Sequence, residues 1–168
     1  MATVTQPLRD EHKELMPHIE SLRVAADAIG RASDEEVRRQ LDTAYDFLAH
    51  HLIPHALAED RALYPVVDRV LGAPGATATM SRDHVEVGRL TEELRALREE
   101  AGARGIDEAR SMALRRVLYG LYALVHVHFA KEEEVYLPLL DAKLPADEAR
   151  AMFEAMERAA GDAKAAAV

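Results

Sequence analysis

The stretch HALAEDRALYP, residues 55–65, recurs as HFAKEEEVYLP, residues 128–138, with histidine, glutamate and proline at the same three places. A shift of 73 residues superposes these two frames, and a shift of 72 residues superposes His12 on His84 in the segments that precede them. Because both halves carry the same pattern in the same order, we interpret the chain as a duplicated helical hairpin.

Apolar residues recur at helical spacing along almost the whole chain, and no useful length alternates with period two. Breaks rich in glycine or proline, and Ser33 as an N-cap, divide this pattern. Two antiparallel hairpins with short loops predict an all-α protein, an up-down-up-down four-helix bundle followed by a short fifth C-terminal helix. The predicted helices cover residues 6–30, 34–70, 77–101, 107–142 and 146–160.

The composition limits the classes of fold and function. The chain has 168 residues, of which 49% are hydrophobic, so we expect a single domain over residues 1–168, with the bundle at about 6–142 and a C-terminal helix and tail at 146–168. A formal net charge of −9 disfavours nucleic acid and anionic membrane surfaces as partners. The absence of a signal-peptide pattern and of a spanning apolar run predicts a cytoplasmic protein.

Histidines from the four long helices are predicted to meet at one level of the bundle. His12 lies about 20 residues before the first hairpin loop and His55 about 23 residues after it, so a rise of about 1.5 Å per residue puts both roughly 30–35 Å from that loop. His84 and His128 lie at about the same distance from the second loop. Four imidazoles can therefore reach one layer.

Each repeated frame adds a carboxylate to this layer, because residues four apart share a helix face. Two carboxylates that bridge a pair of cations, with two imidazoles on each cation, leave positions for a bridging oxygen and an external ligand. With no cysteine in the chain, this ligand set suits iron, manganese or zinc, and its place between facing helices favours iron. We therefore predict two iron ions with a bridging oxo or hydroxo group, held by six side chains: His12, His55, Glu59, His84, His128 and Glu132.

The order of one histidine, one His-x-x-x-Glu, a second histidine and a second His-x-x-x-Glu resembles the hemerythrin-like HHE domain family. The resemblance covers about residues 8–142, includes the aromatic residue and proline after each His-x-x-x-Glu, and implies a di-iron site in a four-helix bundle. Gly88 stands where the oxygen-carrying hemerythrins have a second histidine on the third helix. The pattern is therefore more similar to members associated with iron-centre repair, iron sensing, or reactions with nitric oxide and peroxide.

We expect the site to bind or reduce a small oxidant (peroxide, nitric oxide or oxygen), as in a di-iron peroxidase, a catalase-like enzyme or a nitric-oxide-processing oxidoreductase. An alternative is a non-enzymatic sensor or carrier of iron, oxygen or nitric oxide that uses the same site. A metal-free structural bundle is a third interpretation. The apolar stripe of the C-terminal helix predicts packing across the bundle, docking to a partner, or association into a homo-oligomer.

Other residues have weaker claims to the site. His51, four residues before His55, is a candidate for an extra nitrogen ligand or for a hydrogen-bond donor behind the ligands. Tyr136 is a candidate ligand, proton donor or oxidisable ring, with packing as the alternative, and Tyr64 is interpreted as a core aromatic. Three acids are expected to face solvent on the outer face of the bundle: Asp60, Glu133 and Glu134.

Overall fold

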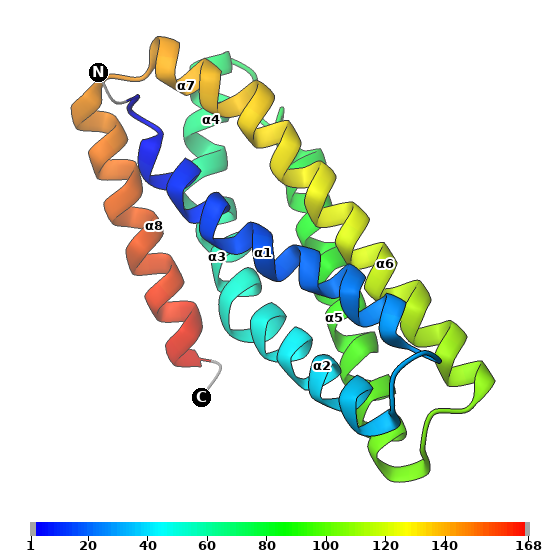
Figure 1. Cartoon of the computed structure of the whole chain (residues 1–168). Helices are drawn as coiled ribbons and strands as arrows, with labels where there is room; N and C mark the ends of the chain where they lie inside the picture. The colour runs from blue at the N-terminus through cyan, green and yellow to red at the C-terminus, as the bar shows by residue number, and fades with distance from the viewer. Residues whose placement is uncertain (1–2, 167–168) are drawn as a thin grey trace.

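The structure is a computed structural model that describes residues 3–166, and within this range every regular element is helical. Five helical segments are joined by short loops (Figure 1). The first is α1 (Gln6–Ala28), the third is α5 (Ala78–Arg104) and the fifth is α8 (Ala146–Ala166). The second and fourth segments contain π-helical turns, which are labelled η. The second segment consists of α2 (Asp34–Phe47), η1 (Leu48–Leu52), α3 (Ile53–Ala58), η2 (Glu59–Leu63) and α4 (Tyr64–Leu71). The fourth segment consists of α6 (Glu108–Lys131), η3 (Glu132–Tyr136) and α7 (Leu137–Lys143).

The prediction of an all-α protein is confirmed for the described residues, and the predicted ends of the four long helices lie within three residues of the observed ones. The fifth helix continues to Ala166 instead of ending at residue 160. Ser33 caps α2 as predicted, because its hydroxyl accepts a hydrogen bond from the Glu36 N–H at 3.3 Å. Within residues 3–166, no helix combines the length and the apolar character that crossing a membrane requires.

The four long segments pack side by side, and α8 covers one flank. α1 packs against α6 and α2, and α5 packs against α6, α2 and α3. The α1–α2 and α5–α6 loops lie at one end of the molecule, and the α4–α5 loop lies at the other (Figure 1). α8 runs along α3 and η2, beside the first half of α1 (Figure 1). The middle of the second segment is therefore enclosed by helices on several sides.

The π turns coincide with prolines. Each turn ends two residues before one of them: Pro54, Pro65 or Pro138. Proline has no N–H, and its ring clashes with the carbonyl of the fourth residue before it, so a regular α-turn is disfavoured there. The wider π turn moves that carbonyl aside and lets the helix continue with a different register.

Two of these π turns belong to the repeated frames. η2 begins at Glu59 and η3 begins at Glu132. The Tyr64 N–H donates to the Glu59 carbonyl, and the Leu137 N–H donates to the Glu132 carbonyl, each across five residues. Such turns are often found at functional sites. In both frames the glutamate therefore lies at the start of a π turn, and the proline lies just after its end.

The apolar core is divided into two clusters, and each of the four long segments contributes to both. One cluster includes Ile19, Leu52, Val87 and Phe129. The other includes Leu8, Ala58, Met80 and Leu137, together with Met152 and Met156 of α8. Along each segment a histidine or glutamate of the predicted layer lies between the two: His12, His55, His84 and Glu132. The polar layer therefore separates two apolar cores.

We predict that Leu94→Ala lowers the free energy of unfolding by about 2–5 kcal/mol, because the side chain is completely buried in the larger cluster and its loss leaves a cavity. Met112→Ala is the matched control: this side chain is 64% exposed, so its truncation should change stability by less than about 0.5 kcal/mol. Urea titration followed by circular dichroism measures both. Equal effects of the two substitutions would contradict the assignment of the core.

Candidate metal centre

The six predicted ligand residues come together between the two apolar clusters. His12 lies on α1, His55 on α3, His84 on α5 and His128 on α6, and the two glutamates open the π turns. The glutamate side chains are completely buried, and the four imidazoles are between 3% and 8% exposed. Residues from four segments that are distant in the sequence thus share one enclosed layer.

Glu59 presents one oxygen to each pair of imidazoles. Its Oε1 lies 2.9 Å from Nε2 of His55 and 3.7 Å from Nε2 of His12. Its Oε2 lies 3.3 Å from Nε2 of His84 and 4.0 Å from Nε2 of His128. Two groups of three ligand atoms, each within 4.8 Å of one another, therefore share this carboxylate. A carboxylate placed in this way can bridge two cations.

Glu132 lies across the layer in a similar position. Its Oε2 is 3.4 Å from Nε2 of His12, and its Oε1 is 3.6 Å from Nε2 of His128. Nε2 of His84 and Nε2 of His128 are 3.0 Å apart, a separation that suits two nitrogens aimed at a common position. Both glutamates therefore connect the α1 side of the layer with the α6 side.

The outer nitrogen of every imidazole faces a carboxylate. Four acids place an oxygen 2.8 to 3.1 Å from the Nδ1 atoms of His12, His55, His84 and His128: Glu133, Glu11, Asp60 and Asp83, in that order. Arg9 bonds to Glu133, and Lys131 bonds to Asp83. The contacts at His12 and His128 are hydrogen bonds, and such partners fix the orientation of the ring and direct the other nitrogen at a metal.

The prediction that Asp60 and Glu133 face solvent is therefore wrong, whereas Glu134 is exposed as expected. A residue that follows an inward glutamate is rotated by about 100° on the helix and meets the neighbouring helix rather than water. The sequence contained a signal for this arrangement. An acid precedes each lone histidine and follows each frame glutamate in both halves: Glu11 and Asp83, then Asp60 and Glu133.

The buried polar atoms fit cations better than they fit one another. Among the described residues, five of them have no hydrogen-bond partner and belong to the inner face of the layer: Nε2 of His12, Nε2 of His55, both oxygens of Glu59 and Oε2 of Glu132. Buried polar groups are rarely left without partners, because the loss of hydration costs roughly 1–3 kcal/mol for each. Metal ions between these atoms would satisfy all five.

Comparison with protein families also indicates a domain that binds cations. Residues 3–140 match the family model of the hemerythrin HHE cation-binding domain. The chain belongs to the hemerythrin family. Comparisons with curated proteins and with solved structures gave no significant match. Hemerythrins typically bind iron, so this domain is indicated as a metal-binding one, and α8 lies outside the matched range.

Tyr64 is a residue of this hemerythrin site that the sequence prediction missed. Its hydroxyl donates to Oε1 of Glu132 at 2.8 Å and lies 3.0 Å from Nε2 of His128 and 3.4 Å from Nε2 of His84. The shift of 73 residues places Leu137 at the equivalent position in the second half. No repeat therefore marks Tyr64, and the two halves of the site differ at this point.

The two weaker candidates lie away from the inner face. His51 is exposed and stacks on Phe47, with ring centroids 6.4 Å apart. His51 lies within η1, which ends three residues before the inward-facing His55, so residues four apart no longer share one helix face there. Tyr136 is half-buried and packs against the smaller apolar cluster. Packing, the alternative proposed for Tyr136, agrees with this position.

The ionisable groups of the site shift one another's pKa. Burial opposes a charge on His55, but the nearby charge of Glu59 raises the pKa of His55 well above its usual value. Burial also opposes a charge on Glu59, and the facing His55 nevertheless holds the pKa of Glu59 well below its usual value. Burial likewise opposes a charge on His128, but the contacts of His128 with Glu132 and Glu59 raise its pKa to about 10.

We predict that the metal-free hemerythrin domain becomes less stable as the pH rises from 7 to 10. The pKa of His128 is raised in the folded state, from 6.5 to about 10, so its contribution to stability is complete below pH 6.5 and is lost as the pH rises through about 10. Thermal melts of the chelator-treated protein at closely spaced pH values measure this effect. A melting temperature that increases over this pH range would contradict a pKa of His128 raised by Glu132 and Glu59.

We predict that Tyr64→Phe destabilises the metal-free protein by about 1–3 kcal/mol, because a buried oxygen of Glu132 loses its hydrogen-bond donor. The loss should be smaller after iron is added, since a metal would satisfy the same carboxylate. Tyr136→Phe is the matched control and should have little effect in either state. Denaturant titrations with and without iron compare the unchanged protein with the two variants. An equal loss of stability for Tyr64→Phe in both states would show that Glu132 does not bind the metal.

Proposed function

We propose that this hemerythrin-family chain is a non-haem di-iron protein that binds or reduces small oxidants: peroxide, nitric oxide or oxygen. The observation that carries the proposal is the position of Glu59, whose two oxygens face two separate pairs of imidazoles. In the proposed site His12 and His55 would hold one iron, and His84 and His128 would hold the other. Glu59 and Glu132 would bridge the two irons, together with an oxo or hydroxo group.

The proposal includes an up-down-up-down bundle, in which the layer is formed by facing helices. The short loops, the packing of α1 on α2 and α6, and the packing of α5 on α6 support this topology (Figure 1). In such a bundle the centre is a common position for a metal pair, since each helix contributes inward side chains at the same height. The duplicated frame would then supply one carboxylate and one imidazole to each half.

Nitrogen and oxygen ligands without sulfur support iron as the metal. Four imidazoles and two shared carboxylates provide four protein ligands for each ion, which leaves positions for an external ligand. Bound there, the iron pair would supply Lewis acidity and electrons to a small oxidant. The protein's own contribution is to hold the imidazoles in one orientation through the four outer carboxylates.

The space beside the ligands supports a small substrate. A cavity of about 10 Å³ lies against Glu59 and is walled by five apolar side chains: Leu52, Ala56, Val87, Val125 and Phe129. A volume of about 10–15 Å³ holds the centre of one water molecule. Larger organic substrates are thereby disfavoured at this position. The Tyr64 hydroxyl, which donates to Glu132, lies 3.0 Å from Nε2 of His128, and His128 also lines this cavity.

We predict that His128→Ala and Glu132→Ala abolish the binding of two irons per chain, because each removes a buried ligand. Glu134→Ala should bind iron as the unchanged protein does, because Glu134 is exposed. Glu133→Gln should weaken iron binding by roughly 10- to 100-fold through the orientation of His12. Elemental analysis after anaerobic loading and gel filtration measures these outcomes. Two irons per chain in all four variants would contradict the assignment of the metal ligands.

The activity of the loaded protein distinguishes an enzyme from a carrier or sensor. Disproportionation of peroxide to water and oxygen requires no external reductant, so peroxide loss can be followed directly with the purified protein. We expect rapid loss with the unchanged protein and none with His128→Ala. A stable and reversible oxygen spectrum, without turnover of peroxide or nitric oxide, would instead assign the alternative role.

A further inference from the structure

A cavity between α8 and the rest of the molecule reaches the proposed metal centre. Its volume is about 380 Å³, and α1, α3 and α8 contribute its walls. One wall residue is His55, whose side chain is 3% exposed and whose Nε2 lies on the inner face of the layer. Among the described residues, this Nε2 has no hydrogen-bond partner. Nδ1 of the same ring faces Glu11, another wall residue, so the cavity leads from the surface to a buried imidazole of the ligand layer.

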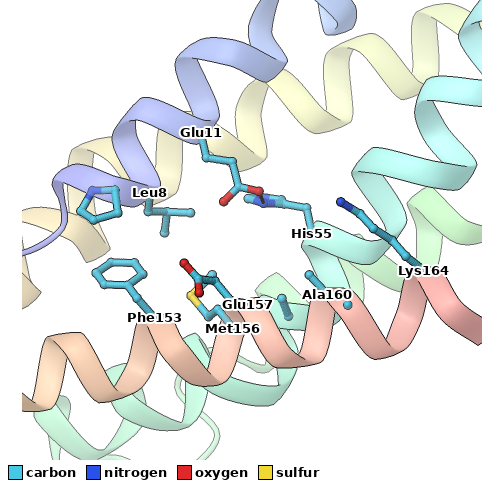
Figure 2. Close-up of a pocket in the computed structure, with 11 residues that line it drawn as sticks. Leu8, Glu11, His55, Phe153, Met156, Glu157, Ala160 and Lys164 are labelled. Carbon is cyan, nitrogen blue, oxygen red and sulfur yellow. Dashed lines mark ion pairs between the residues drawn. The ribbon is translucent and has the colours of Figure 1, made fainter.

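The charged side chains of this cavity favour a cation. Figure 2 shows the carboxylates of Glu11 and Glu157 extending into it from opposite walls, on α1 and α8. Oε1 of Glu11 lies 3.1 Å from Nδ1 of His55, while half of the Glu11 side chain is exposed. Lys164 contributes a positive charge at the end nearer the C-terminus (Figure 2). Two carboxylates thus lie along the path to His55, against one ammonium group.

A second cavity on the other side of the layer has a different charge. It measures about 310 Å³, lies between α1 and α6, and reaches His12 and Phe129. Arg9 and Lys13 line it together with Glu133, and Arg9 bonds to Glu133. A divalent cation approaching by this path would meet a guanidinium and an ammonium group. The cavity under α8 is therefore the better route for a metal ion.

We propose that the cavity under α8 is the loading route for divalent iron, in which Glu157 and Glu11 attract the hydrated ion and pass it to His55 and Glu59. Its volume admits the whole hydrated ion, because six waters occupy roughly 180 Å³ at about 30 Å³ each. Carboxylates are suitable oxygen ligands to replace those waters. The net charge of −9 attracts cations to the protein in general, and the two carboxylates direct them to this point.

This inference rests on the proposed function, since it requires iron at the ligand layer, and it assigns a role to α8. Residues 146–166 lie outside the matched hemerythrin domain, and α8 contributes Phe153, Met156, Glu157 and Ala160 to the cavity. Ala58 and Ala160 are small residues on facing walls, where α8 packs on α3. A larger side chain at Ala160 would narrow the path without changing any proposed ligand.

The test is the rate at which the metal-free, full-length protein takes up ferrous ion under anaerobic conditions. Aliquots are stopped with excess chelator, passed through gel filtration and analysed for iron. We expect Glu157→Gln to load about 3- to 10-fold more slowly at low ionic strength, with the same final two irons per chain and a smaller difference at high salt. Lys164→Gln should load faster, and Ala160→Leu should load more slowly at every salt concentration.

Glu154→Gln is the matched control, because it removes the same charge from an exposed position of α8 that does not line this cavity. It should load within about twofold of the unchanged protein. Equal rates for Glu157→Gln and Glu154→Gln, together with unhindered loading of Ala160→Leu, would overturn the route while leaving the di-iron site intact. Failure of the unchanged protein to bind iron would instead overturn the proposed function.

Discussion

Two carboxylates, those of Glu59 and Glu132, are completely buried in the middle of a helical protein, and the surrounding structure compensates for their charge. An unpaired buried carboxylate is strongly unfavourable, so a fold that retains two of them needs positive charge or hydrogen-bond donors nearby. Four imidazoles and the Tyr64 hydroxyl surround the pair on the protein side. A pair of cations would complete the compensation, since several inner atoms otherwise have no partner among the described residues.

The remaining architecture follows from this layer. The apolar core is divided because the polar layer passes through its centre, and each long segment contributes apolar side chains above and below it. The two frame prolines follow π turns that begin at the two glutamates. Four outer acids lie beside the Nδ1 atoms of the four imidazoles, whose Nε2 atoms face the two glutamates. Binding of metal at such a site is coupled to stability and to the release of protons from the histidines.

Much of the fold and the inner face of the site could be predicted from the sequence. Helical periodicity gave the four long segments, and a constant rise per residue placed His12, His55, His84 and His128 at one height. A single His-x-x-x-Glu is weak evidence for a metal site. The duplication strengthened the prediction because the same motif occurs a second time at the equivalent position of the other half. The helix ends were predictable because glycine, proline and the Ser33 cap interrupt the pattern.

The remaining features depend on relations that one helix does not contain. Asp60 and Glu133 point away from the inner face of their own helices, and only the neighbouring helices place a histidine beside them. Tyr64 has no counterpart in the second half, so the repeat gives no reason to select it. His51 was misplaced because η1 changes the helical register just before His55. The spacing of residues in the sequence therefore does not predict two features: the contacts between neighbouring helices, and the π turns.

The central claim is that six side chains from four helical segments hold two cations. Anomalous diffraction from crystals of the iron-loaded protein, measured on both sides of the iron absorption edge, tests it most directly. The account predicts two anomalous peaks in the layer, one beside Nε2 of His12 and His55, the other beside Nε2 of His84 and His128, with Glu59 and Glu132 between them. Iron found elsewhere on the protein, or a layer in which these atoms bind no metal, would contradict the account.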